Sequence, residues 1–139
     1  MFSRILVPLD LSHRNAPAVE MVGDLLASDG GVAILVHVIE EIEGVPREES
    51  EDFYGEFRQR AESLLADFRK KLEHRGISVD TQIRMGRRGA EVVRCATEER
   101  CDLIVLRSHA LDPEEPMRGI GTVSHQVALA APCGVLLLR

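Results

Sequence analysis

The sequence predicts an α/β domain in which a five-stranded parallel sheet lies between two layers of helices. Two observations support this: short, nearly continuous apolar runs rich in β-branched residues, and segments between them whose apolar residues recur at three- and four-residue spacing. Strands that alternate with helices pair in parallel through right-handed crossovers, so helices cover both faces of the sheet. In such a three-layer sandwich, ligands bind beyond the carboxyl ends of the strands, where the strand order reverses.

The length and charge of the chain limit what it can be. Its 139 residues suit one domain and are too few for two, so residues 1–139 are interpreted as a single domain. The formal net charge of −6 argues against nucleic acid as a main partner, because phosphate binding needs a concentrated basic face. Arg84, Arg87 and Arg88 are the candidates for a local basic patch, although a solvated strand end is the preferred interpretation.

The lack of a recognisable targeting segment predicts a cytoplasmic protein, and the cysteines predict neither disulfides nor a zinc site. The amino terminus becomes polar too early for a signal peptide, and no apolar run approaches the roughly 20 residues of a membrane span. Cys95, Cys101 and Cys133 form neither an even set nor a CxxC pair, so neither a disulfide framework nor a zinc site is expected. We interpret them as buried or half-buried apolar residues.

The first half of the chain contains the first three strands. Arg4–Leu9 and Val32–Ile39 are apolar runs typical of strands buried on both faces, and a helix that begins near Asn15 lies between them. Apolar spacing from Phe53 to Leu72 then predicts a long amphipathic helix, followed by a strand over Ile77–Ile83.

Two features of this region have more than one interpretation. The acidic stretch Glu40–Asp52 is a solvated loop or a partner-recognition loop, and the first is preferred. Phe53 and Phe57 are core residues or a lid over a ligand cleft, and we expect core.

The second half repeats the alternation. It contains a helix over Ala90–Arg100, a buried strand over Asp102–Leu106, a loop over Arg107–Ile120, a helix from Thr122 and a final apolar strand over Cys133–Leu138. The final strand ends the chain and is apolar, so it can form a sheet edge that requires covering.

Four segments together resemble the universal stress proteins over essentially the whole chain. They are RILVPLD at the start, LVHVIE at the end of the second strand, MGRRGAEVVRCATEERCDLIVLRSH across the third crossover and GTVSHQVALAAPCGVLLLR at the end. The resemblance implies a flavodoxin-like (adenine nucleotide alpha hydrolase-like) sheet and a homodimer paired through the C-terminal strand. It also implies, for one subgroup of the family, a bound ATP or AMP.

The resemblance further implies which residues hold the base and ribose. In the nucleotide-binding subgroup, the aspartate after the first strand holds the ribose or base region, and a residue at the end of the second strand flanks the adenine. These positions are similar to Asp10, with Leu9 beside it, and to Val38. Without the resemblance, Asp10 would be a helix cap or a polar strand end, and Val38 a core residue.

The phosphate site of that subgroup is similar to a loop with the pattern G-x2-G-x9-G followed by Ser or Thr. This sequence keeps the end of the pattern and the helix start behind it, in Gly121, Thr122, Val123 and Ser124. Amides at a helix start attract phosphate, although Thr122 and Ser124 are equally typical helix caps. Arg107 and Ala110 replace the two leading glycines, which narrows the available backbone geometry.

This loop contains both acidic residues, which repel phosphate, and basic residues, which attract it. Asp112, Glu114 and Glu115 would repel a triphosphate unless they point away, whereas Arg118, or with less support Arg107 or His109, would compensate.

These residues predict a small stress-response regulator that binds ATP or AMP, with magnesium as an optional companion and no cofactor required. No catalytic residue and no metal site is assigned, so enzymatic activity is limited to slow ATP hydrolysis or autophosphorylation. The alternative is a nucleotide-free dimeric interaction protein of the same fold. No nucleic acid or membrane partner is expected, and no pattern identifies a protein partner.

Overall fold

The computed structural model describes residues 1–139 except 29, 42, 45–50 and 109–122. Its sheet has five parallel strands in the order β3-β2-β1-β4-β5, which confirms the predicted architecture. The strands are β1 (Arg4–Pro8), β2 (Val32–Ile39), β3 (Ser78–Met85), β4 (Leu103–Arg107) and β5 (Gly134–Leu138). The helices found within the described residues are α1 (Ala16–Leu26), α2 (Glu51–Glu73), α3 (Arg88–Glu98), α4 (Val123–Ala130) and a 3-10 turn, η1 (His13–Asn15).

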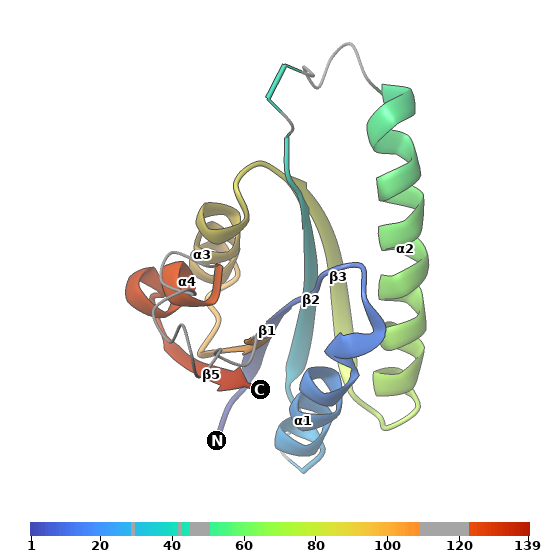
Figure 1. The fold of residues 1–139 in the computed structure, drawn as a ribbon. Coiled ribbons are helices and arrows are strands. Elements are labelled where there is room, and N and C mark those ends of the chain that lie inside the picture. The colour runs from blue at the N-terminus through green and yellow to red at the C-terminus, as the bar shows by residue number, and fades with distance from the viewer. Residues whose placement is uncertain (29, 42, 45–50, 109–122) are drawn as a thin grey trace.

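The helices form two layers, one on each face of the sheet (Figure 1). Alternate residues of β1 point to opposite faces, as the two-residue period of a strand requires. Ile5 and Val7 pack with residues of α1 and α2, such as Val22 and Phe68, whereas Leu6 packs against α3 and α4. Both faces of the central strands are therefore buried, which explains their continuous apolar sequences.

The strand order reverses between β1 and β4. From β1 the chain continues to β2 and β3 on one side, and it later adds β4 and β5 on the other side. Connections that leave neighbouring strands in opposite directions open a crevice at their carboxyl ends. The residues after β1 and at the end of β4 line that crevice.

The aromatic residues at the start of α2 differ from the prediction. Phe53 is 44% exposed and Phe57 is half-buried, whereas Tyr54 is 4% exposed. The expectation that both phenylalanines belong to the core is therefore wrong for Phe53. The ring of Phe53 contacts those of Tyr54 and Phe57 edge to face, with centroid distances of 5.2 Å and 5.6 Å. The inward face of the helix begins one residue later than the apolar spacing suggested.

The cysteines match their predicted environments. Cys95 and Cys101 are buried and Cys133 is half-buried, and all three are free thiols. None of the helices in the described part of the chain is long and apolar enough to cross a membrane.

Candidate functional site

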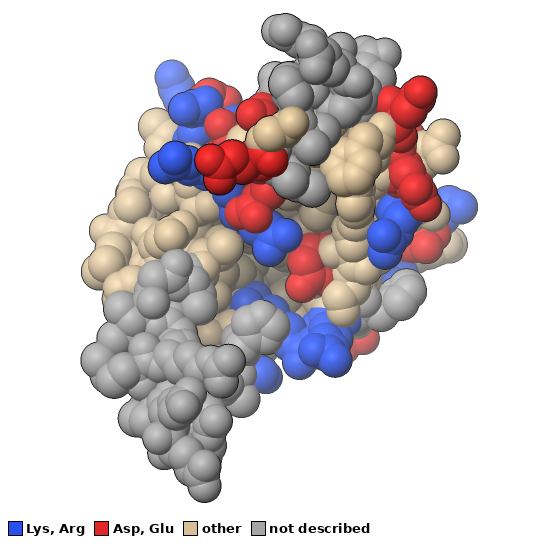
Figure 2. Space-filling view, turned by 45° about the horizontal axis from the view of Figure 1, so that its top comes forward, with Lys and Arg blue, Asp and Glu red and all other residues tan. Residues whose placement is uncertain are grey.

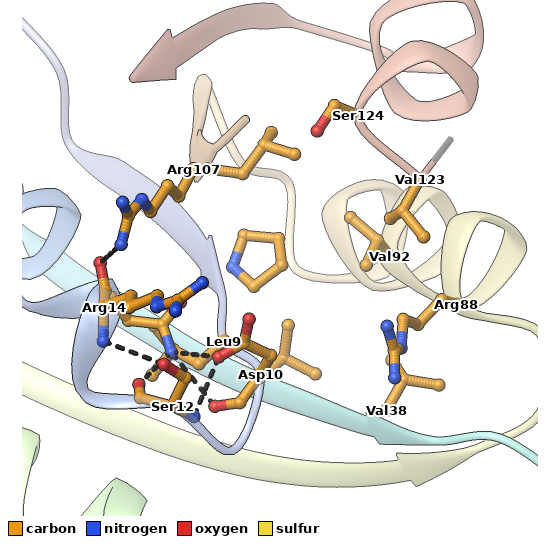
Figure 3. A pocket seen from close by; sticks show the side chains of 14 residues that line it. Leu9, Asp10, Ser12, Arg14, Val38, Arg88, Val92, Arg107, Val123 and Ser124 are labelled. Atoms are coloured by element: carbon orange, nitrogen blue, oxygen red, sulfur yellow. Dashed lines mark hydrogen bonds between the residues drawn. The ribbon is translucent and has the colours of Figure 1, made fainter. Parts of the chain in front are cut away.

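A cavity of about 410 Å³ lies at the carboxyl ends of β1, β2 and β4, in the crevice where the strand order reverses. This volume lies within the range of sites that hold small molecules and cofactors. Its lining divides into an apolar wall, a polar turn after β1, three arginines and the start of α4 (Figure 3).

The apolar wall comes from two strands and a helix. Val36 and Val38 of β2, Val92 of α3 and Leu106 of β4 line the cavity on the α3 side of the sheet. Val38 is 4% exposed and is part of the hydrophobic core as well as of the cavity wall. A flat aromatic group fits such a wall, because the burial of apolar surface is the main source of binding energy for such a group.

The polar turn after β1 is centred on Asp10. Its Oδ1 accepts hydrogen bonds from the Ser12 N–H and from Asn15 Nδ2, both at 2.8 Å. Asn15 Nδ2 also lies 3.0 Å from the carbonyl oxygen of Asp10 and 2.6 Å from that of Ser12. Among the described residues no group donates to Oδ2 of Asp10, so this exposed oxygen can accept from a ligand.

Asn15 has a different role from the one its position suggests. It occupies the N-cap of α1 but makes no side-chain capping hydrogen bond, and it is 4% exposed. Its amide instead donates to the turn that carries Asp10. The spacing of Asp10, Ser12 and Asn15 is visible in the sequence, yet it does not distinguish this turn from an ordinary helix start.

His37 supports the floor of the cavity from the other side of the sheet. Its Nδ1 lies 2.7 Å from the carbonyl oxygen of Leu9, and because a carbonyl can only accept, Nδ1 carries the proton. Burial lowers the pKa of His37 and outweighs the bond to Leu9, which acts to raise it. The ring is therefore neutral near pH 7, as expected for a structural histidine. Leu9 is 5% exposed and lines the cavity beside Asp10.

Three arginines line the cavity on two sides (Figure 3). Arg107 and Arg14 lie on the side of the turn, where Arg107 Nη1 donates to the carbonyl oxygen of Arg14 at 2.6 Å. Arg88 lies on the opposite side near Val38, with its Nε 4.0 Å from Oε1 of Glu40. The cavity thus combines one carboxylate with three guanidinium groups.

The candidate basic patch of Arg84, Arg87 and Arg88, for which a solvated strand end was preferred, is divided by the fold. Arg84 is only 16% exposed at its side chain and forms ion pairs with Glu98 at 2.6 Å and Glu91 at 3.4 Å. Arg88 instead lines the cavity. Sequence reasoning grouped these arginines by position and did not assign Arg14 or Arg88 to the site, because only the fold brings these residues together.

The start of α4 supplies the last part of the lining. Val123 and Ser124 both face the cavity. Gly121 and Thr122, which the resemblance assigns to the phosphate site, lie outside the described residues. Most of the preceding loop, Arg107–Ile120, lies outside them as well. Of the predicted site residues, the structure thus brings Leu9, Asp10, Val38, Val123 and Ser124 to one cavity. No group of acidic, histidine and cysteine side chains that could hold a metal ion occurs in the described part of the chain.

Comparison with known proteins points to one family. The family model described as the Universal stress protein family matches residues 1–139. A universal stress protein of Methanothermobacter thermautotrophicus is 28% identical over 144 residues, with all of this chain and 97% of the relative covered.

Solved structures of the same family share the fold. The structure of hypothetical protein MJ0577 superposes with a TM-score of 0.84 at 26% identity, covering 99% of this chain and 96% of that one. A second relative by sequence is universal stress protein MJ0577 of Methanocaldococcus jannaschii, with 28% identity over 78% of each chain. An Arabidopsis thaliana universal stress protein family protein with AMP bound gives a TM-score of 0.71 at 20% identity, covering 98% and 90%. The adenine nucleotide alpha hydrolase-like architecture is thereby confirmed.

Proposed function

The chain belongs to the universal stress protein family, and we propose that it is a stress-response regulator that binds an adenine nucleotide, ATP or AMP, in the cavity described above. The observation that carries this proposal is the pairing of an apolar wall with the unused oxygen of Asp10 in one crevice. The AMP bound to a family member of the same fold is consistent with it.

The two parts of the cavity suit the two halves of a nucleoside. Val38 and Val92 offer apolar contact to the faces of an adenine ring. Oδ2 of Asp10 accepts hydrogen bonds from ribose hydroxyls, and Ser12 and Asn15 hold the carboxylate in place through Oδ1. The helix start at Val123 and Ser124 then receives the phosphate nearest the sugar.

We propose binding rather than turnover as the main activity. Asp10 is the only acidic side chain in the described cavity lining, and its Oδ1 is engaged by two donors. ATP hydrolysis or autophosphorylation is therefore expected to be slow at most. If magnesium accompanies a triphosphate, the phosphates themselves would hold it, because the one carboxylate of the described lining, that of Asp10, is assigned to the ribose.

Co-purified ligand and calorimetry test the proposal. Nucleotide released by denaturation would be identified by chromatography, and the apo protein would be titrated with AMP and ATP. Asp10→Ala should weaken binding about tenfold or more, because the ribose loses its charged acceptor, whereas Asp67→Ala, an exposed aspartate on α2, should not change it. Absence of co-purified nucleotide together with absence of binding at millimolar AMP and ATP would contradict the proposal and favour the nucleotide-free interaction protein.

We also propose a homodimer paired through β5. This strand pairs with β4 on one side and forms a sheet edge on the other, where Leu137 is 42% exposed, and Leu129 of α4 is 77% exposed. A second copy would cover this apolar edge. Sedimentation of Leu137→Lys should give a monomer, with Thr81→Lys on the opposite edge strand β3 as the control. A wild-type monomer at all concentrations would contradict it.

A cytoplasmic location completes the proposal. Cys95, Cys101 and Cys133 are free thiols, as is usual in a reducing compartment. Fractionation of cells followed by immunodetection tests the location.

A further inference from the structure

We propose that Arg14 and Arg107 form a guanidinium clamp for the outer phosphates of the bound nucleotide, so that the site prefers ligands with two or three phosphates. This inference rests on the proposed function and specifies its ligand class. Neither arginine forms an ion pair with an acidic side chain of the described residues, and both line the same side of the cavity (Figure 3).

The topology brings the two arginines together. Arg14 lies in η1, the next element after β1, and Arg107 is the last residue of β4. β1 and β4 are neighbouring parallel strands between which the strand order reverses. The two side chains therefore flank the crevice in which ligands of such sheets bind, although 93 residues separate them in the sequence.

One hydrogen bond orients the guanidinium of Arg107 and ties it to the backbone of Arg14. Arg107 Nη1 donates to the carbonyl oxygen of Arg14 at 2.6 Å, which ties the end of β4 to η1 and fixes the direction of the guanidinium. A guanidinium has five N–H donors in a planar fork, so four remain on Arg107 and all five on Arg14 in the described part of the structure. This fork matches the geometry of phosphate oxygens.

Of the three arginines that line the described part of the cavity, Arg88 lies 4.0 Å from a carboxylate oxygen of Glu40, whereas Arg14 and Arg107 have no carboxylate partner among the described residues. Arg4, Arg69, Arg75, Arg84 and Arg94 each form an ion pair with a carboxylate within the described residues. Arg14 and Arg107 form none there, in a chain whose formal net charge is −6. Figure 2 turns the carboxyl end of the sheet toward the reader and shows Lys and Arg side chains beside a hollow near the centre of this face.

The position of Asp10 separates the clamp from the base. Asp10 lies between the arginine side of the cavity and Val38, so a ribose held by its Oδ2 places the base toward Val38 and the phosphates away from it. Arg107 takes the place of the first glycine of the family's phosphate loop, so the clamp would supply by side chains what that loop supplies by backbone amides.

Calorimetric titration with adenosine, AMP, ADP and ATP tests the clamp. Wild-type affinity should rise with the number of phosphates, and Arg14→Ala and Arg107→Ala should each weaken ATP binding about tenfold or more while leaving adenosine unchanged. Arg107→Lys should recover part of the loss, because it keeps the charge without the planar fork. Arg60→Ala, an exposed arginine on α2, is the matched control, and circular dichroism melting checks the fold of each variant.

Titration with inorganic tripolyphosphate separates this inference from the proposed function. Tripolyphosphate binding that both alanine variants lose supports the clamp even if no nucleotide binds. Equal ATP affinity of wild type and the Arg14→Ala/Arg107→Ala double variant overturns the clamp while leaving nucleotide binding intact. Failure of the wild type to bind both ATP and tripolyphosphate overturns it as well.

Discussion

Nδ1 of His37 lies 2.7 Å from the carbonyl oxygen of Leu9, so a buried side chain of β2 fixes the backbone that leads into Asp10. His37 is 5% exposed, and its imidazole faces the α1 and α2 side of the sheet while its neighbours Val36 and Val38 face the cavity side. This hydrogen bond thus links the core of the protein to the floor of the candidate site.

The lowered pKa of His37 predicts that the protein loses stability in mild acid. Because the pKa lies below 6.5 in the folded state, the unfolded chain takes up this proton first as the pH falls. The contribution of neutral His37 to the free energy of unfolding is complete above pH 6.5. It declines as the pH falls toward the folded pKa, by at most about 1.4 kcal/mol per pH unit.

Denaturant titrations between pH 8 and pH 5 measure this effect. His37→Gln should unfold more easily at pH 8, by about 1 kcal/mol, because its amide forms a poorer bond to Leu9. It should also have a flatter pH dependence than the wild type. His74→Gln, which changes an exposed histidine after α2, should retain the wild-type slope. If His37→Gln retained the wild-type pH dependence as well, the loss of stability in mild acid could not be assigned to His37.

Asp102 predicts a second pH dependence, at lower pH. Its carboxylate accepts from the Ser3 N–H at 2.8 Å, the Ser3 hydroxyl at 2.9 Å and the Arg4 N–H at 3.1 Å. Burial acts to raise the pKa of Asp102, but these hydrogen bonds outweigh it and hold the pKa below 3.8. The stabilisation is therefore complete above about pH 3.8 and is lost as the pH falls through the folded pKa.

Asp102→Asn should lower the free energy of unfolding at pH 7 by about 1 kcal/mol, because the amide can replace only part of this set of acceptors. The difference from wild type should shrink as the pH approaches 3. Asp67→Asn on α2 is the matched exposed control. A constant difference across the pH range would show that the charge of Asp102 is unimportant.

Gly31 marks a close approach between the start of β2 and the chain before β1. A Cβ at this position would lie 2.7 Å from the Ser3 carbonyl oxygen and 2.7 Å from Cδ2 of Leu26. The carbonyl cannot move easily, because it accepts from the Val32 N–H at 2.9 Å. Gly31→Ala should therefore destabilise the protein by about 1 to 3 kcal/mol.

Gly55 offers the matched control for this substitution. A Cβ at Gly55 in α2 meets no atom within 4 Å, so Gly55→Ala should stabilise the protein by up to about 1 kcal/mol through helix propensity. Thermal melts of the two variants should shift in opposite directions. A shift in the same direction would contradict the packing argument.

The sheet could be predicted from the sequence because its signal is local. Runs such as Val32–Ile39 are apolar on both faces, and each strand was found to within two residues. Phe53 was assigned to the core and is exposed, because apolar spacing fixes the face of a helix only to about one residue at its first turn.

From the sequence, site residues could be predicted only where they come at or directly after the end of a strand. Asp10 was predicted in this way, with support from the family resemblance, whereas Val38 was predicted from the resemblance alone. The contact between Arg107 and the Arg14 carbonyl was not predicted, because it joins the end of β4 to η1, and their proximity depends on the strand order. Asn15 was placed at a helix start, and its bond to Asp10 depends on the conformation of the turn.

Asn15 predicts how strongly the site depends on the orientation of Asp10. Its Nδ2 donates to Oδ1 of Asp10 at 2.8 Å from a position that is 4% exposed. Asn15→Ala leaves that oxygen with the Ser12 N–H as its remaining donor and lets the carboxylate rotate. Binding of AMP should weaken about two- to tenfold, which corresponds to the loss of one hydrogen bond. In the Asp10→Ala background the same substitution should cause no further loss, because Asn15 acts on the ligand through Asp10. Calorimetry of the four proteins completes this double-mutant cycle, and additive losses would show that Asn15 acts independently of Asp10.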